Sequence, residues 1–336
     1  MSPRTRVAVA KPLLDLAIPD AARRVTRAQF DRWCLQSREL AAGTNPDALH
    51  DYRTSVRRLR TLLRLLGPWL PALSRGSRRR LRDLMQLTGP ARNLEVLLAW
   101  IEKHRLSLTS RQRTGARWLS RRIGVRLGLL HGDTQRHLSR KGAKVEARLR
   151  TELFVSVRAI PSAPVGGRVI RRLLRQETAI LNRRLGAIAS MEDRSLIHSA
   201  RIAAKRVRYL LEPFAIELPD GNAMLQRLRE LQELIGNLTD LHVAAEELRE
   251  ALIVANAGRA ERLTYQLVPW SADRQDRGKS PAPPLGAQGG LVRLAEILRK
   301  EGDEQFEQLE TWLGEPKVTL MGMLRRAGTV SRGGRI

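Results

Sequence analysis

Two stretches of the chain repeat one helical motif, and this duplication restricts the folds that the sequence can adopt. "LHDYRTSVRRLRTLLRLL" begins at Leu49, and "IHSARIAAKRVRYLLEPF" begins at Ile197. A shift of 148 positions places His50 on His198 and aligns the basic residues that follow each histidine. The same shift aligns Arg23, Arg24 and Arg27 with Arg171, Arg172 and Arg175. Because one unit is used twice, we expect two similar helical bundles related by pseudo-twofold symmetry.

The composition favours an all-α fold. Leu, Ala, Arg, Glu and Gln are good helix formers, and little of the chain alternates polar and apolar residues as a strand would. Aromatic residues make up only 4% of the chain and hydrophobic residues 42%, so aliphatic side chains must fill the core. We expect helices at about 20–40, 49–66, 75–87, 91–105, 109–130, 134–157, 168–189, 191–214, 225–235, 238–248 and 291–313.

Glycine and proline interrupt this helical pattern and indicate where helices and domains end. Both residues are unfavourable inside a helix, so "TGP" before Ala91 and "IGN" around Gly236 predict helix breaks. Asp20 is a candidate N-cap, Gly43 a helix end, and Pro46 a first-turn residue. The expected divisions are a tail at 1–19, a first repeat at 20–159, a linker at 160–167, a second repeat at 168–314 with a flexible loop at about 268–290, and a basic tail at 315–336.

The chain is strongly basic. It has 61 Lys and Arg residues against 34 Asp and Glu residues, which gives a formal net charge of +27. Self-repulsion of this size weakens a compact state unless an anion offsets it. A nucleic acid, an anionic membrane face or an inorganic polymer would each serve as partner. The alternative is that a scattered positive surface does no more than keep the protein soluble.

The placement of the charges favours a polyanionic ligand. At about 100° per residue, His50, Arg53, Arg57, Arg60 and Arg64 lie on one side of their helix, opposite an apolar face. The second copy repeats this stripe. A solvated face is the simpler interpretation, but such faces mix signs because like charges at i,i+4 destabilise a helix. Positions 50–66 contain one acidic residue and 198–211 contain none.

We therefore predict an anion-binding site built by both copies. Guanidinium groups suit phosphate oxygens because their donors form a rigid fork. One histidine alone would be a turn or packing residue, but two in register with the basic stripes favour a role as phosphate donors. No metal ligands stand at a suitable spacing on that face. The candidate site residues are Arg23, Arg27, His50, Arg53, Arg57, Arg58, Arg60, Arg64, Arg171, Arg175, His198, Arg201, Lys205, Arg206, Arg208 and Tyr209.

These motifs resemble the CHAD domain, the conserved histidine α-helical domain. Its signature is similar to His-x-x-Arg-x-x-x-[Arg/Lys]-Arg-x-Arg and occurs twice, as it does here from His50 and from His198, with Tyr209 completing the second copy. The downstream element appears as "TGPARN" and "IGNLTD". The resemblance extends over about 20–314. Asn93 stands where the family often has Asp, so a salt bridge at that position is in doubt.

The resemblance implies two tandem antiparallel four-helix-type bundles with a central basic channel that binds inorganic polyphosphate, at polyphosphate granules in some members. Many members carry a triphosphate-tunnel (CYTH) domain, but this chain has no room for one and no Glu-x-Glu-x-Lys at its start. We therefore expect a stand-alone, non-catalytic binding protein without a cofactor. The segment 268–290 resembles an insertion.

Two other classes of function remain open. Weak non-specific nucleic-acid binding follows from the charge, although no helix-turn-helix, aromatic stacking set or RNA motif is present. A polyphosphate-processing enzyme would need carboxylates to hold metal ions, and Glu233, Asp240, Glu246 and Glu247 are expected to pair with arginines or face solvent instead. The single cysteine, Cys34, suits a core position in a cytoplasmic protein. No secretory signal or membrane span is expected.

Overall fold

The computed structural model describes residues 11–43, 47–155, 163–267, 284 and 286–329. Throughout this part of the chain the regular structure is helical, apart from one isolated bridge between Ala17 and Val165, so the expected all-α fold is confirmed. None of the described helices is both long enough and apolar enough to cross a membrane. The expected first-turn position of Pro46 and the linker up to Ser162 lie outside the described residues.

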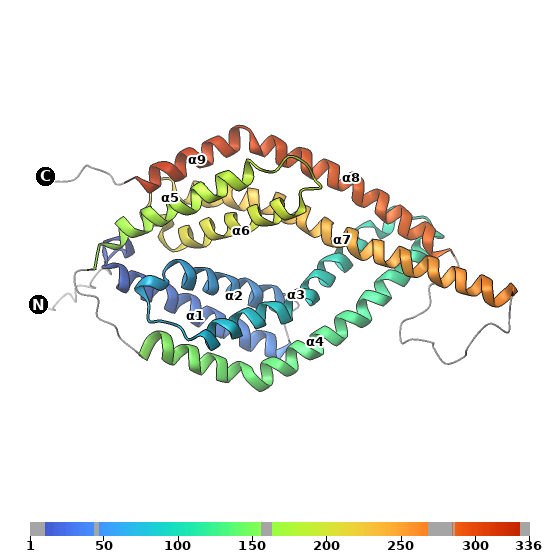
Figure 1. The fold of residues 1–336 in the computed structure, drawn as a ribbon, viewed down its shortest axis with the longest axis horizontal. Helices are drawn as coiled ribbons and strands as arrows, with labels where there is room; N and C mark the ends of the chain where they lie inside the picture. The colour runs from blue at the N-terminus through green and yellow to red at the C-terminus, as the bar shows by residue number, and fades with distance from the viewer. Residues whose placement is uncertain (1–10, 44–46, 156–162, 268–283, 285, 330–336) are drawn as a thin grey trace, which may run out of the picture.

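The first repeat contributes four helices, which lie along the lower side of the molecule in Figure 1. They are α1 (Ile18–Ala42), α2 (Ala48–Leu65), α3 (Arg75–His104) and α4 (Gln112–Arg150), the last continuing into a π-helical turn at Thr151–Val155. As predicted, Gly43 ends α1, in the left-handed conformation (φ 68°) that glycine adopts at little cost. Asp20 is not the N-cap, because α1 begins two residues earlier, after Ala17.

The second repeat forms the upper side of Figure 1. Its helices are α5 (Gly166–Leu185), α6 (Arg194–Leu211), α7 (Gly221–Leu267), α8 (Ala287–Leu313) and α9 (Glu315–Gly328). The order α5, α6, α7, α8 repeats the order α1, α2, α3, α4. The motif-bearing helices α2 and α6 contact each other near the middle of the molecule, while α3 and α4 extend toward α7 and α8.

Among the described residues, three apolar cores hold these helices. One lies in the first repeat around Phe30, Trp33 and Tyr52. A larger one lies in the second repeat and includes residues from α1 and α2 such as Ile18 and Leu62. The third joins both repeats where α3 and α4 meet α7 and α8. Since two of the three cores contain residues of both halves, the repeats pack against each other and do not form separate domains.

Close backbone approach also joins the halves. A Cβ atom on Gly115 of α4 would lie 2.1 Å from the Ala287 carbonyl oxygen of α8, and one on Gly290 would lie 2.0 Å from the Gln112 carbonyl oxygen. Any side chain at either glycine would push α4 and α8 apart. At the opposite end of the molecule, the Glu217 carboxylate accepts hydrogen bonds from the backbone N–H groups of Leu13 and Leu14, at 2.8 and 2.7 Å.

Three predicted helix breaks are absent. Helix α3 runs through Pro90, α4 continues through Gly132, and α7 continues through Gly236. Proline lacks an N–H and crowds the carbonyl one turn earlier, here that of Gln86, and the Arg53 guanidinium of α2 donates to the neighbouring Met85 carbonyl of α3. Burial of the long apolar faces exceeds the local cost of glycine, about 1 kcal/mol per residue.

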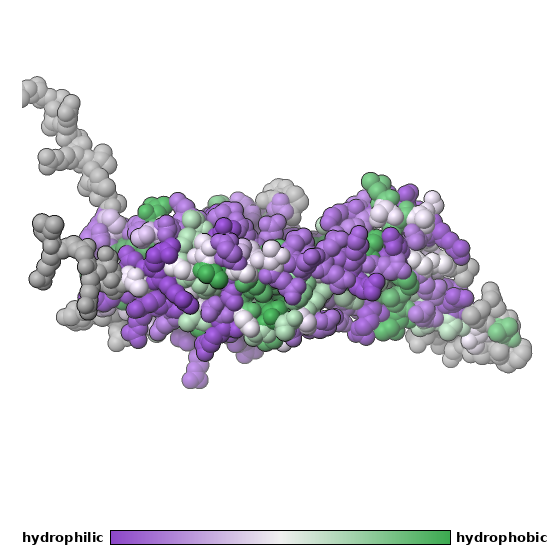
Figure 2. Space-filling model, turned by 90° about the horizontal axis from the view of Figure 1, so that it is seen from above, coloured by the Kyte–Doolittle hydropathy of each residue, from purple (hydrophilic) through white to green (hydrophobic). Residues whose placement is uncertain are grey.

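The predicted tails were also too long. The chain beyond Gly314 forms α9, whose Leu320 and Leu324 are fully buried against the second-repeat core. Residues 287–290, expected in the flexible loop, are the first turn of α8. Leu13–Asp15 forms a short 3-10 helix tied to Glu217. The face viewed in Figure 2, which looks down on α8 and α9, is mainly hydrophilic with smaller apolar patches.

Candidate anion-binding site

The basic stripes of α2 and α6 meet where these two helices contact each other. The apolar face of α2 is buried through Tyr52, Val56 and Leu59, and that of α6 through Ala200 and Val207. The remaining faces carry the cations. The charge of Arg57 on α2 contributes to lowering the pKa of His198, Arg201 and Lys205 on α6. We call Arg53, Arg57, Arg201, Lys205 and Arg208 the central cluster.

Lys205 shows how crowded the central cluster is. Burial, followed by the charges of Arg201, Arg57 and Arg208, lowers the pKa of Lys205 to about 6, although Asp240 acts in the opposite direction. An amine with this pKa is mostly uncharged at neutral pH. The cluster therefore holds one cation fewer at neutral pH than its sequence implies.

Two guanidinium groups of the cluster, those of Arg53 and Arg201, are also disfavoured in their charged form. Burial, then the charges of Arg57 and Arg92, lowers the pKa of Arg53 to about 10, despite the opposing effect of Glu95. Burial also lowers the pKa of Arg201, and Arg57 adds to this effect. The buried Nε of Arg201 makes no hydrogen bond. A buried donor without an acceptor is costly, and a phosphate oxygen would remove that cost.

The two repeats position their first arginine in related ways. A Cβ atom on Gly89 would lie 3.6 Å from an Arg53 Nη atom, and one on Gly236 would lie 3.8 Å from an Arg201 Nη atom. Each repeated glycine therefore leaves bare helix backbone beside a repeated arginine. Arg53 donates to the Thr88 hydroxyl at 2.9 Å, and Arg201 lies 3.6 Å from the Asp240 carboxylate.

Arg53 and Arg201 have different partners because the first repeat has Asn93 where the second has Asp240. Asp240 supplies the ion pair to Arg201, whereas Asn93, its equivalent in the first repeat, is exposed and Arg53 binds Thr88 instead. The doubt that the sequence raised about a salt bridge at Asn93 was justified. The expectation that Asp240, Glu246 and Glu247 pair with arginines is confirmed, with partners Arg201, Arg194 and Arg126 respectively.

Tyr209 and Glu212 link the two halves beside the central cluster. The Glu212 Oε1 atom lies 3.2 Å from Arg58 Nη2 of the first repeat and 3.4 Å from Arg208 Nε of the second. The guanidinium groups of these two arginines lie 5.4 and 5.1 Å from the centre of the buried Tyr209 ring. Tyr209 thus stabilises two cations through its ring face. The sequence predicted Tyr209 as a site residue, and in the structure it contacts the arginines of the site.

A further group of arginines lies at the edge of the central cluster. Arg60 and Arg64 line a hollow of about 470 Å³ together with Arg78 and Arg82 of α3, and no acidic residue contributes to its lining. Burial, followed by Arg82 and Arg57, lowers the pKa of Arg60. These four guanidinium groups extend the positive region from α2 onto α3.

The two histidines lie at the borders of the cluster. Burial and then Arg92 lower the pKa of His50, while Asp51 acts in the opposite direction. Burial, then Arg201, Lys205 and Arg57, lower the pKa of His198. Both imidazoles are consequently neutral at physiological pH and can donate one N–H to an anion. Within the described part of the chain, neither imidazole forms a hydrogen bond to another protein group, so both can turn toward a ligand.

Four candidate residues lie apart from the central cluster. Arg23 donates to the Phe154 carbonyl oxygen at 2.7 Å, and Arg27 lies over the Phe154 ring at 4.7 Å. In the second repeat, Arg171 donates to the Ala327 carbonyl oxygen at 2.8 Å. The side-chain stem of Arg175 also packs there, because a Cβ atom on Gly328 would lie 2.3 Å from its Cγ atom. Both pairs therefore cover the C-terminal end of a helix, where cations are favourable.

Sequence reasoning missed three contributors to the site. Arg92 acts on His50 and Arg53, and Arg82 acts on Arg60. Neither arginine belongs to the repeated motif, and the false break at Pro90 hid the helical register that carries them toward α2. Glu212 was missed because its equivalent in the first repeat is Arg64. A continuous helix at 75–104 would have revealed Arg82 and Arg92.

The fold and the site define an all-α protein built from a duplicated helical unit, whose two histidine-bearing helices bring their cations together at one interface. The chain belongs to the CHAD domain family, since the family model matches residues 24–249. Among curated proteins, no sequence is similar enough to count as a relative.

Two solved structures share the fold. The crystal structure of the CHAD domain from the plant Ricinus communis is 21% identical with a TM-score of 0.61, and the match covers 92% of this chain and 96% of that one. PptA from Streptomyces chartreusis is 17% identical with a TM-score of 0.59, and the match covers 87% of this chain and 99% of that one. At these identities the likeness concerns the fold alone.

Proposed function

We propose that the protein binds inorganic polyphosphate at the central cluster and does not chemically transform it. The observation that carries this proposal is the convergence of Arg57 from one repeat with Arg201 and Lys205 from the other. Such an arrangement is unfavourable by itself, because buried like charges repel each other across a medium of low dielectric constant. A polymer with one negative charge per phosphate offsets this repulsion along its whole length.

The chemistry of the donors supports a phosphate ligand. The Nε of Arg201 is buried without an acceptor, and the neutral imidazoles of His50 and His198 border the cluster. Guanidinium forks match phosphate oxygens bidentately. Because much of the binding free energy would come from counterion release, the affinity should fall steeply as salt rises, as it does for nucleic-acid ligands.

The acidic residues around the cluster support binding without catalysis. Asp240 and Glu212, the carboxylates that contact it, each pair with arginines. Enzymes that transfer phosphoryl groups usually hold metal ions through carboxylates. Carboxylates engaged with guanidinium groups are poor candidates for that role. We further propose that binding of the polymer would place the protein at polyphosphate granules.

Binding measurements on charge-neutralised variants test the proposal. Arg57→Gln removes a central cation, and Lys205→Gln removes an amine that a bound anion would make cationic, while Arg32→Gln removes an exposed cation of α1 and is the control. We expect both cluster variants to lose at least about tenfold in affinity for long-chain polyphosphate, the equivalent of one strong charge-assisted contact. The control should keep the affinity of the unmodified protein.

Competition with other anions separates this proposal from its alternatives. Long-chain polyphosphate should displace duplex DNA, and orthophosphate should compete only weakly because it cannot contact both repeats at once. Preference for DNA would favour the nucleic-acid interpretation. Metal-dependent release of orthophosphate from polyphosphate by the pure protein would contradict the non-catalytic part of the proposal.

A further inference from the structure

The first repeat has a second basic groove, between α3 and α4, which the central cluster does not include. It has a volume of about 740 Å³. Its cationic lining comes from both helices and consists of Arg79, Arg80, Arg140, Lys141, Lys144 and Arg148, with His137 beside them. Leu84 and Val145, both buried, are the apolar residues of its lining.

The charges of this groove are largely uncompensated. Asp83 is the one acidic residue in its lining, and it lies 3.9 Å from Arg79. Within the described part of the chain, Arg140, Lys141 and Lys144 lie in no ion pair with an acidic side chain. On α4, moreover, residues 140, 144 and 148 follow each other at i,i+4, where like charges destabilise a helix.

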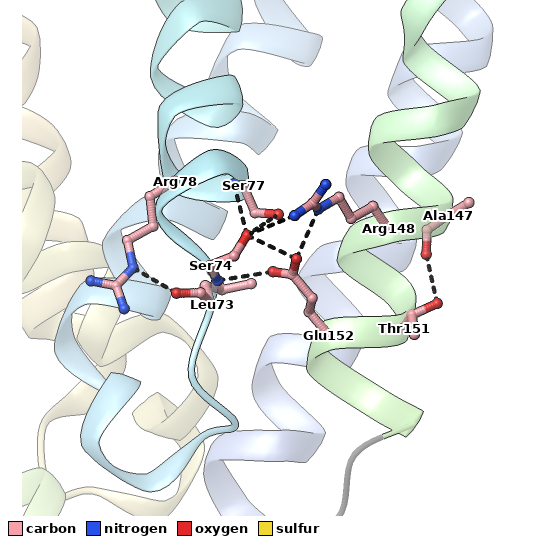
Figure 3. A network of polar contacts seen from close by, with 8 residues as sticks. All are labelled: Leu73, Ser74, Ser77, Arg78, Ala147, Arg148, Thr151 and Glu152. Atoms are coloured by element: carbon pink, nitrogen blue, oxygen red, sulfur yellow. Dashed lines mark hydrogen bonds and ion pairs between the residues drawn. The ribbon is translucent and has the colours of Figure 1, made fainter.

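The groove lies beside the N-terminal end of α3. Arg79 and Arg80 belong to the second turn of α3, and the first turn of this helix contains no acidic residue. Negative charge is favourable near that end because the helix N-terminus carries a partial positive charge. The negative charge comes instead from Glu152 beyond α4, whose carboxylate accepts hydrogen bonds from the Ser74 N–H and hydroxyl, at 3.1 and 2.9 Å (Figure 3).

The same contacts hold the two walls of the groove together. Arg148 donates through Nε to Glu152 at 2.9 Å, and Figure 3 shows its guanidinium reaching toward Ser74 and Ser77 from α4. Burial raises the pKa of Glu152, but hydrogen bonds from Arg148, Ser74 and Ser77 outweigh it and keep the pKa below its usual value. At this end of the groove, the charged Glu152 carboxylate therefore joins Ser74 to Arg148 of α4 without a ligand.

Duplication does not account for this groove. A shift of 147 places Arg79 on Gln226, Arg80 on Arg227 and Asp83 on Glu230. In the second repeat Arg227 pairs with Glu230 at 3.1 Å, so that the equivalent surface of α7 is neutralised internally. The excess charge between α3 and α4 is a property of the first repeat alone and not a relic of the shared unit.

We propose that this α3–α4 groove is a second binding site for inorganic polyphosphate, separate from the central cluster. The proposal rests on the proposed function. A linear inorganic polyanion suits the groove better than a nucleic acid, because the lining is dominated by cations and contains no Phe, Tyr or Trp as a platform for successive bases. Two sites on one polymer would increase the affinity for long chains beyond that for short ones.

Paired variants test the two sites separately. The groove variant carries Arg80→Gln, Arg140→Gln and Lys144→Gln, and the cluster variant carries Arg57→Gln and Lys205→Gln. The matched control carries Arg111→Gln, Arg117→Gln and Arg121→Gln, three exposed arginines of the segment that opens α4. Calorimetric titration with tripolyphosphate should give two sites for the unmodified protein and the control, and one for each of the other variants.

Long-chain polyphosphate provides the second measurement. We expect the groove variant to bind it at least about tenfold more weakly than the control, because the second contact is lost. Since the substitutions relieve repulsion, thermal unfolding of the groove variant should occur at the same temperature as for the control or higher, which excludes misfolding as the cause.

The outcomes separate this inference from the proposed function. Unchanged stoichiometry and affinity of the groove variant would overturn the second site and leave the central site standing. Loss of binding in the groove variant together with unchanged binding in the cluster variant would support the groove and refute the central site. Groove-dependent binding of duplex DNA that polyphosphate does not displace would show a nucleic-acid site and overturn the inference.

Discussion

Arg58 of the first repeat and Glu212 of the second form an ion pair, with Nη2 and Oε1 3.2 Å apart. The duplication predicts an equivalent pair formed by Arg206 and Arg64. Arg64 lowers the pKa of Arg206, after burial, so these two residues do lie near each other but repel. The pseudo-symmetric contact between α2 and α6 is therefore attractive on one side and repulsive on the other. On the repulsive side, the Glu177 carboxylate partly offsets the effect of Arg64 on Arg206.

Substitutions at the two equivalent positions should have opposite effects on stability. Glu212→Gln leaves Arg58 and Arg208 without their shared partner, and we expect the free energy of unfolding to fall by about 1–3 kcal/mol. Arg64→Gln removes a like-charge contact and should leave the stability unchanged or slightly higher, while weakening polyphosphate binding. Urea unfolding with a constant m-value measures the first effect. Equal destabilisation by both variants would refute this description of the interface.

Lys205 should make stability depend on pH. Its pKa is about 6 in the folded protein against 10.5 for an ordinary lysine, so the unfolded chain binds the extra proton between these values. Stability should therefore rise with pH through this window. In Lys205→Met the same slope of unfolding free energy against pH should be smaller. An identical slope in both proteins would show that Lys205 is charged in the folded state.

Polyphosphate binding should be accompanied by proton uptake. An anion beside Lys205 favours the charged amine and raises its pKa from about 6. Titration calorimetry at pH 7.5, in buffers with different ionisation enthalpies, should reveal the protons taken up. His50 and His198, whose pKa values are also lowered, should contribute to this uptake. The Lys205→Gln variant should take up fewer protons than the unmodified protein, and no difference would contradict the assignment.

Arg23 and Arg171 should matter more for stability than for binding. Each donates to a carbonyl oxygen at a helix end, that of Phe154 and that of Ala327 respectively. We expect Arg23→Gln and Arg171→Gln to lower the free energy of unfolding by about 1 kcal/mol each. Their polyphosphate affinity should stay within about threefold of the unmodified value, a difference of less than 1 kcal/mol. A loss of polyphosphate affinity as large as that of Arg57→Gln would show instead that both arginines belong to the binding site.

The residues that entered the candidate site from sequence were those with a repeated, one-sided pattern. The period of α2 and α6 placed Arg57, Arg201 and Lys205 on cationic faces, and the structure brings these faces together. The same pattern at Arg23 and Arg171 led to helix ends instead. A helical period states which side of a helix a residue occupies, but not which neighbouring helix that side will meet.

Local chemistry in the chain was enough to establish helices, their amphipathic faces and the duplication, because these depend on residues a few positions apart. Tertiary packing decided the rest. It carried α3 through Pro90, formed α9 from an expected tail, buried Lys205 among arginines of both repeats and created the groove between α3 and α4. The physical reason is that burial and electrostatic repulsion depend on distances in space, and those distances join residues far apart along the chain.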